Sequence, residues 1–354
     1  MDELRAWLDE RAEQHLFSGV VLVHRGGEPV FSHAAGLAHR GHGVPVRADT
    51  RFAVASVTKL VTATAALQLV ERGALGLHAP LVDVLPAEHR PVALTREHTL
   101  HHLLSHTSGL TNYHDDDDET GASFIACWDR IPTYHVRKPA DMLPLFADLP
   151  AHSPPGARFS YGDANYILIG LVIEAVTGRS YHDVVAAEVL APAGMADAGF
   201  DALDTDPVRL ATGYQVADGP YETWLSNVFS ITATGMPDGG MICAAPDLVR
   251  LIDALRGEAH RAGRLRRHDH AARRGRTRLL VRLRHAARRR RRRRHRHRAQ
   301  RRRPRRGRRR RAPPRRGHHR RRPQQPGPRV LARVPPGARR VGAPRSPVTF
   351  PSVV

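Results

Sequence analysis

The chain has 354 residues, 41% of them hydrophobic, and a formal net charge of +22. That length allows one large domain or two of ordinary size, and no apolar run is long enough to cross a membrane. The two cysteines, Cys127 and Cys243, lie too far apart in sequence to indicate a disulfide framework or a cysteine-based metal site. Residues 1–23 open with a charged amphipathic segment and lack the apolar stretch of a secretory signal peptide, which favours a cytoplasmic protein.

The charge is divided unevenly along the chain. Residues 1–263 carry 19 Lys+Arg against 33 Asp+Glu, whereas the remainder carries 37 against one. This tail contains no Lys and is mostly Arg, Pro, Ala, Gly and His, residues whose codons are rich in G and C. A solvated basic arm usually mixes Lys with Arg, Ser, Gln or Gly. We therefore interpret residues 263–354 as an out-of-frame reading of a GC-rich gene, and we expect the segment to be disordered because it has too little apolar surface to fold.

The first third of the chain predicts a helix, a hairpin and a second helix. Apolar residues recur at helical spacing in residues 4–12, and two apolar runs then flank Gly26-Gly27 as strands flank the turn of a β-hairpin. Residues 56–73 read as one helix with an apolar stripe, and the glycine at its end is typical of a helix C-terminus.

Two more helices and one irregular region follow. Residues 112–154, with four consecutive aspartates and several prolines, predict a loop-rich insertion. The apolar stretch 164–178 predicts a buried helix closed by Gly178, and residues 245–257 predict a third helix that Gly257 ends.

Ser56 and Lys59 in "SVTK" are the first candidates for chemistry. Residues three apart share one face of a helix, so the lysine amine is placed to reach the serine hydroxyl. A serine becomes a nucleophile when a base takes its proton, and a lysine desolvated among apolar neighbours is shifted toward the neutral form that can do so. The Ser56 backbone N–H is a candidate for half of an oxyanion hole. Many surface helices contain this spacing, so the motif alone favours the simpler interpretation, a helix N-terminus with a solvated lysine.

The context of that motif resembles a known family. "FSGVVLVHRGGEPVFSHAAG" leads to "SVTKLVTATAALQLVERG", then come "HHLLSHTSGL" and "FSYGDANYILIGLVIEAVTG". In this order they resemble the serine hydrolases that include class C β-lactamases, D-alanyl-D-alanine carboxypeptidases and related esterases. The resemblance implies an α+β, β-lactamase/transpeptidase-like fold, an antiparallel sheet flanked by helices with a mostly helical subdomain. We expect residues 1–262 to form this hydrolase domain, with its C-terminal part missing or disordered.

The resemblance also implies roles for individual residues. Ser56 matches the acylated nucleophile, Lys59 its lysine partner, and Tyr161 the tyrosine that relays a proton to the leaving group and later activates water. The second motif of the family is usually Tyr-x-Asn, whereas here it reads Tyr161-Gly162-Asp163. Asp163 is therefore expected to bond the lysine and to contact substrate, although a carboxylate donates no amide hydrogen. No metal or organic cofactor is implied.

Other polar residues have simpler interpretations. Ser105 and Ser108 lack a basic partner at a suitable spacing, and we interpret them as helix-end and turn residues. Histidines 98, 101, 102 and 106 fit no common zinc pattern. Gly239-Gly240 indicates a tight backbone position near the site.

A third motif, usually His-x-Gly or Lys-Thr-Gly, is absent after Gly257. In the family its strand lines the pocket and supplies the second oxyanion donor. The codons of residues 298–305 can be read one nucleotide forward, with each Arg taken as encoded by CGN. The shifted codons permit the sequence Gly-His-(Asn/Ser)-Gly-Gly-x-Pro-Gly, which resembles that motif. We place the shift between about residues 259 and 265, and we expect poor solubility and no robust turnover for the chain as written.

The sequence therefore predicts an esterase, carboxypeptidase or β-lactamase type of enzyme that acts on a small ester or amide, impaired by loss of the third motif. Two alternatives remain: an Arg-rich tail that binds nucleic acid non-specifically through phosphate contacts, and a catalytically dead relative that only binds ligand. No feature of the sequence bears on the oligomeric state.

Overall fold

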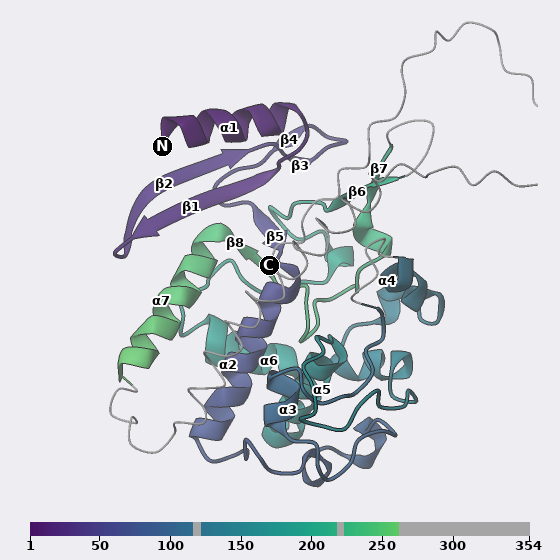
Figure 1. Ribbon diagram of the computed structural model, residues 1–354. Helices are drawn as coiled ribbons and strands as arrows, with labels where there is room; N and C mark the ends of the chain where they lie inside the picture. Colours follow the sequence, from purple (N-terminus) through teal and green to yellow (C-terminus); the bar gives the residue numbers. More distant parts are fainter. Residues whose placement is uncertain (116–121, 218–222, 262–354) are drawn as a thin grey trace, which may run out of the picture. The chain divides into compact units, whose positions relative to one another are not determined.

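The computed structural model describes residues 1–115, 122–217 and 223–261 (Figure 1). The segment 262–354, which includes the predicted out-of-frame tail, lies outside the described residues, so the expectation of a missing or disordered C-terminal part is not addressed by the fold. Four aspartates were singled out in the predicted insertion, and only Asp115 is described.

The N-terminal part is a helix laid on a hairpin. Helix α1 (Asp2–Glu13) precedes β1 (Gly19–Arg25) and β2 (Glu28–Ala35), which pair antiparallel. Gly26 and Gly27 both have positive φ, +64° and +94°, which non-glycine residues rarely adopt, and they form the tight turn between the strands. The predicted helix and hairpin are confirmed.

The remaining strands form small antiparallel pairs. Strand β3 (Leu37–His39) pairs with β4 (Val44–Pro45), β5 (Arg51–Ala53) with β8 (Ile242–Ala244), and β6 (Tyr214–Ala217) with β7 (Thr223–Ser226). The described residues thus contain four two-stranded sheets where a single antiparallel sheet was expected. The β5–β8 pair matters most for function, because it joins two segments almost 200 residues apart directly before the "SVTK" motif.

Two long helices form the centre of the helical part. Helix α2 (Thr58–Glu71) packs against α5 (Ala164–Thr177), in which ten consecutive residues from Ala164 to Ile173 are buried. Such a helix, apolar on every side, is stable only when other elements surround it. The smaller helices α3 (Leu100–Leu104) and α6 (Tyr181–Val185), the latter continued by a π-helical turn, Ala186–Leu190, supply part of that cover.

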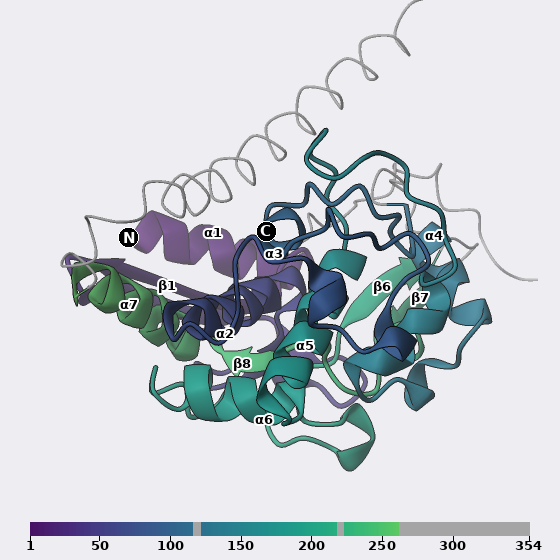
Figure 2. The same cartoon turned by 90° about the horizontal axis from the view of Figure 1, so that it is seen from below.

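Helix α7 (Ala245–Arg261) follows β8 and lies against β1, while α1 lies along the same hairpin (Figures 1 and 2). The predicted ends of the helices are right for α2 and α5, since Gly73 and Gly178 have left-handed φ values of +72° and +66°. The predicted end of α7 is wrong. Gly257 does not adopt a left-handed conformation, and the helix continues through it to Arg261.

The predicted loop-rich insertion is confirmed where it is described. It contains α4 (Ala122–Ala126) and three 3-10 segments, Cys127–Asp129, Thr133–His135 and Pro139–Leu145. The α+β class, with helices packed around small antiparallel sheets and a mostly helical part, agrees with the sequence-based expectation.

One glycine is required where α5 meets the 237–240 turn. A Cβ on Gly170 would lie 2.3 Å from Cγ of Pro237, whereas a Cβ on Gly257, also inside a helix, would meet nothing within 4 Å. Alanine normally stabilises a helix by about 1 kcal/mol relative to glycine. We expect Gly257→Ala to raise the free energy of unfolding by up to that amount and Gly170→Ala to lower it by about 1–3 kcal/mol through overpacking. Urea unfolding of both variants measures this, and stabilisation by Gly170→Ala would contradict the close contact.

Candidate active site

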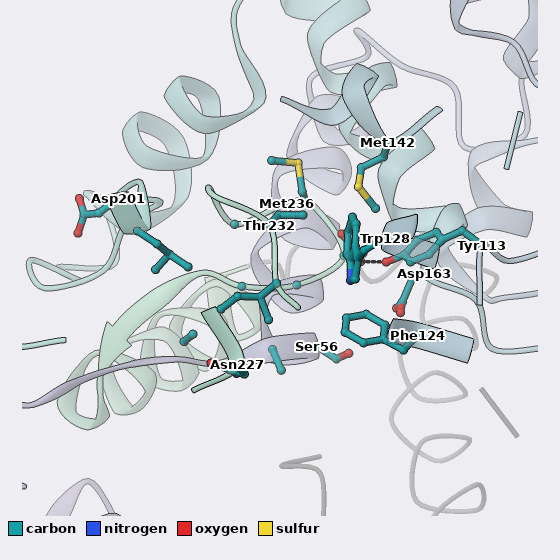
Figure 3. A pocket seen from close by; sticks show the side chains of 18 residues that line it. Ser56, Tyr113, Phe124, Trp128, Met142, Asp163, Asp201, Asn227, Thr232 and Met236 are labelled. Atoms are coloured by element: carbon teal, nitrogen blue, oxygen red, sulfur yellow. Dashed lines mark hydrogen bonds between the residues drawn. The ribbon is translucent and has the colours of Figure 1, made fainter. Parts of the chain in front are cut away.

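Ser56 lies in a 3-10 turn (Ala55–Val57) between β5 and α2. Its predecessor Ala55 has φ +44°, an uncommon conformation for a residue with a side chain. The turn is held by Thr58, whose hydroxyl donates to the Ala55 carbonyl at 2.7 Å and accepts from the Met241 backbone N–H at 2.9 Å. The side chain of Ser56 lines a cavity (Figure 3).

Lys59 is buried directly beside it. Its Nζ donates to Ser56 Oγ at 3.0 Å, so the predicted contact across one helical turn is present. The same ammonium donates to the backbone carbonyl of Asp238 and pairs with Asp163 Oδ1, each at 2.5 Å. Only 7% of the residue is exposed, and these partners come from three separate parts of the chain.

The protonation of Lys59 differs from the sequence-based expectation. Burial does push its pKa down, but attraction to Asp163, aided by Tyr161 and Asp238, outweighs burial and raises the pKa above its ordinary value. Desolvation was expected to favour a neutral amine. That expectation was wrong because it took the surroundings to be apolar, whereas a carboxylate touches the amine.

Tyr161 is the second group on the serine oxygen. Its hydroxyl donates to Ser56 Oγ at 2.9 Å, and Lys59 Nζ lies 5.1 Å from the centre of its ring. Burial raises the pKa of Tyr161, although Lys59 opposes the shift. The sequence-predicted trio of Ser56, Lys59 and Tyr161 is thus brought together around one oxygen atom.

Asp163 lies opposite Lys59, as expected for a residue that bonds the lysine. Burial would raise its pKa, but Lys59, and then His114, hold the pKa below the usual range. The ring nitrogen Nε2 of His114 lies 2.9 Å from Asp163 Oδ2. Sequence reasoning missed His114, because its role depends on a contact with a residue 49 positions away in sequence.

Asp238 was not indicated by the sequence either, because its carboxyl contacts a residue 125 positions away. Its carboxyl Oδ2 accepts a 2.6 Å hydrogen bond from the Tyr113 hydroxyl, and 8% of the residue is exposed. Burial, together with repulsion from Asp163, raises the pKa of Asp238 to about 6. Gly239 and Gly240 lie against Ala55, with the Gly240 N–H 3.3 Å from the Ala55 carbonyl oxygen, so the predicted tight backbone is present.

A cavity of about 230 Å³ is bordered by Ser56, Asp163, Asp238, Gly239 and Gly240 (Figure 3). Its walls combine aromatic and methionine side chains, glycine and alanine residues, and three carboxylates. These aromatic, methionine and carboxylate side chains are Tyr113, Phe124, Trp128, Met142, Asp163, Asp201, Met236 and Asp238.

The serines and histidines interpreted above as structural residues make local hydrogen bonds and ring contacts. Ser108 donates to Asn165 Oδ1 at 2.6 Å, and Ser105 donates to the His101 carbonyl at 2.7 Å. His102 forms a capping box with Thr99 at the start of α3. His106 packs against the ring of Tyr161, 4.5 Å between centroids, and its Nδ1 accepts from the Gly162 N–H.

Comparison with known proteins agrees with this geometry. Residues 4–317 match the sequence profile of the family described as Beta-lactamase. The chain belongs to that family. The matched range of the Beta-lactamase family extends beyond residue 262, so the division of the chain into a hydrolase domain and a tail at 262–263 stays a prediction.

Two members of the family are similar to this chain over most of its length. Esterase EstB of Burkholderia gladioli is 34% identical over 264 residues, which cover 69% of this chain and 67% of EstB. Penicillin-binding protein 4* of Bacillus subtilis is 30% identical, over 71% of this chain and 55% of its own length. The chain therefore spans between about half and two thirds of these relatives.

Solved structures show the same fold. A penicillin-binding protein from Bacillus halodurans aligns with a TM-score of 0.64 and 39% identity, over 70% of this chain and 73% of that one. D-amino acid amidase from Ochrobactrum anthropi aligns with a TM-score of 0.56 at 23% identity, over 72% and 69%, and supports the fold alone. None of the described helices is both long enough and apolar enough to span a membrane.

The buried Lys59–Asp163 pair predicts a large difference between two aspartates. Removing one member of a buried pair costs about 3–5 kcal/mol, whereas Asp204 forms an exposed pair with Arg137, and such pairs contribute little to stability. We expect Asp163→Asn to lower the free energy of unfolding far more than Asp204→Asn at pH 7.

Urea unfolding of both variants tests this difference. Because the pKa of Asp163 is lowered in the fold, its stabilisation is complete above the ordinary carboxyl pKa of about 3.9 and is lost as the pH falls through the lowered value. Measurement at pH 7 therefore captures the whole effect. Equal, small losses in the two variants would show that the pair does not stabilise the fold.

Proposed function

We propose that the chain is a serine hydrolase that cleaves an ester or amide through an acyl-enzyme on Ser56. The observation that supports it most directly is the pair of contacts on Ser56 Oγ, 3.0 Å from Lys59 Nζ and 2.9 Å from the Tyr161 hydroxyl, at the wall of a cavity. A serine hydroxyl requires a neighbouring proton acceptor to attack a carbonyl, and Tyr161 is proposed for this role because Lys59 is held as an ammonium by Asp163. Membership of the Beta-lactamase family supports the same reaction class.

The proposed roles follow from the charges. Asp163 holds Lys59 as an ammonium, so Lys59 stabilises negative charge on its neighbours and favours the phenolate form of Tyr161. In that form Tyr161 takes the proton of Ser56 and becomes a phenol. Ser56 Oγ attacks the carbonyl carbon, and the tetrahedral intermediate collapses as the leaving group takes the proton from Tyr161. Water, activated by the same tyrosine, then attacks the acyl carbon and frees Ser56. The Ser56 backbone N–H is proposed as one oxyanion donor.

The substrate is proposed to be a small ester or amide, in line with relatives that are named esterase and D-aminopeptidase. The cavity of about 230 Å³ fits an acyl group of modest size. The proposed location is the cytoplasm.

An activated ester tests the nucleophile. After exposure to 4-nitrophenyl butanoate, we expect intact-mass spectrometry to show one butanoyl group on the chain and peptide mapping to place it on Ser56. Ser56→Ala should abolish the adduct, Tyr161→Phe should slow its formation by about 10²–10⁴-fold, and Ser105→Ala should leave it unchanged. An adduct that persists in Ser56→Ala would refute the assignment.

We also propose that turnover is impaired because the third motif has been lost through a shift of reading frame. The only basis is the sequence, since residues 262–354 are outside the described part of the chain. In the family, the missing strand supplies the second oxyanion donor, and loss of one such donor costs about 10²–10³ in rate. The 37 basic residues of the tail also make non-specific binding to nucleic acid a proposal, with an affinity that falls steeply with salt.

A matched pair of proteins tests the frame hypothesis. One is the chain as written, and the other is translated one nucleotide forward from a codon between about 259 and 265. We expect the second protein to hydrolyse 4-nitrophenyl butanoate about 10²–10³-fold faster than the first. Equal rates would mean that the residues after 262 do not complete the site in either frame.

A further inference from the structure

One histidine of the "HHLLSHTSGL" segment, His106, contacts Tyr161. It lies in the turn after α3, and 1% of it is exposed. Its φ of +53° is left-handed, a conformation that His, Asn and Asp adopt more readily than other residues with a side chain. A residue keeps such a backbone only where its surroundings hold it. The residues that hold His106 include those on either side of Tyr161.

Two hydrogen bonds tie His106 to both neighbours of Tyr161. The Ser160 N–H donates to the His106 carbonyl at 2.9 Å, and the Gly162 N–H donates to the ring Nδ1 at 3.2 Å. The second bond joins residues 56 positions apart. The backbone is thus fixed one residue before and one residue after Tyr161, which leaves its side chain few orientations.

The ring of His106 also restricts the Tyr161 ring. The two ring centroids are 4.5 Å apart at an interplanar angle of 30°, and Tyr166 packs on the imidazole at 5.2 Å and 32°. Phe159 meets the imidazole edge to face at 5.9 Å. Aromatic rings at these separations attract one another. The imidazole therefore limits rotation of the phenol that reaches Ser56.

The imidazole must be neutral for these contacts. Its Nδ1 can accept a hydrogen bond only when it carries no proton. Besides the two tyrosines, the titratable groups that face the ring are Lys59 and Asp163. Burial, followed by Lys59, lowers the pKa of His106 to about 3. A neutral acceptor therefore supports Tyr161 without adding a second positive charge beside the ammonium.

His106 can affect the reaction only through another residue. It is not among the described residues that line the cavity, so it touches no substrate there. The group it supports is Tyr161, whose hydroxyl lies 2.9 Å from Ser56 Oγ. Proton transfer requires this hydrogen-bond reach. A displacement of about 1 Å at such a site can slow a reaction by about 10²-fold.

We propose that His106 is a positioning residue for acylation, which keeps the Tyr161 hydroxyl on Ser56 Oγ by accepting the Gly162 N–H at its Nδ1. The proposal rests on the acyl-enzyme function proposed above and adds a residue to it. The acceptor is the decisive contact, because it fixes the backbone beside Tyr161, and the ring contact adds to it.

Two substitutions of similar size separate the acceptor from the ring. Both His106→Asn and His106→Leu remove the imidazole, but Asn offers Oδ1 in place of Nδ1 and tolerates a left-handed backbone. The readout is acylation of Ser56 by 4-nitrophenyl butanoate, from the first release of nitrophenolate at several ester concentrations. We expect the maximal rate to fall about 10²-fold in His106→Leu and less than about fivefold in His106→Asn. The ester concentration that gives half the maximal rate should stay unchanged, because His106 does not line the cavity.

A second buried histidine provides the matched control. His98 is also 1% exposed, and its Nδ1 accepts from a backbone N–H, that of Thr95 at 3.0 Å. His98→Leu should therefore lower the free energy of unfolding as His106→Leu does, yet leave the acylation rate of the folded protein unchanged. A loss of rate in both variants would show a general effect on folding and would overturn the proposal.

The effect must also depend on Tyr161. In a Tyr161→Phe background, where acylation is already slow, adding His106→Leu should change the rate by less than about twofold, because no hydroxyl is left to misplace. A further loss of about 10²-fold there, or equal losses in His106→Asn and His106→Leu, would contradict the role of His106. Acylation of Ser56 in the unmodified chain would in that case still support the hydrolase function.

Nitrogen NMR of isotope-labelled histidine tests the acceptor without turnover. Comparison with His106→Asn assigns the ring signals of His106 in the unmodified chain. We expect Nδ1 without a proton and Nε2 with one from pH 5 to pH 8, since the pKa is about 3. A proton on Nδ1, or titration within that range, overturns the proposal even if no ester acylates the chain. Absence of acylation in the unmodified chain, by itself, counts against the hydrolase function.

Discussion

Burial of the Lys59 ammonium is the constraint on which the rest of the site depends. A charged amine with 7% exposure is stable only if acceptors replace its water, and here they come from positions 56, 163 and 238. The turn before α2, the start of α5 and the turn before β8 must therefore converge on one atom. The convergence also places Tyr161, two residues before Asp163, on the serine oxygen.

The packing around α2 fixes the positions of these three segments relative to one another. The Thr62 hydroxyl, one turn after Lys59, donates to the carbonyl of Pro237 at 2.7 Å and lies 2.6 Å from the Tyr181 hydroxyl. Pro237 in turn rests on Gly170 of α5. A continuous set of contacts thus joins α2, α5, α6 and the turn that contains Asp238. A substitution at Gly170 therefore affects the partners of Lys59 although it does not contact them.

Local patterns were enough to predict much of this arrangement. The spacing of Ser56 and Lys59, the glycine turn of the hairpin and the glycine that ends α5 all depend on residues close in sequence. Tyr161 came only from the family resemblance. Asp238 and His114 could not be derived, because their roles arise from contacts 125 and 49 residues away in sequence. The shift of the Lys59 pKa was misjudged although Asp163 was expected to bond the lysine, because the balance between burial and that pairing depends on the three-dimensional contacts of the amine.

The sequence distance between the partners of Lys59 also sets an order of events during synthesis. Its contact with the Asp238 carbonyl spans 179 residues, which a ribosome adds in roughly 10–40 seconds at about 5–20 residues per second. For that interval the acceptors of the amine are incomplete, because Ser56 is already made, Asp163 follows partway through, and the Asp238 carbonyl is made last. Lys59 therefore remains solvated during this interval. The nucleophile acquires its full surroundings only when nearly all of the described chain has been synthesised.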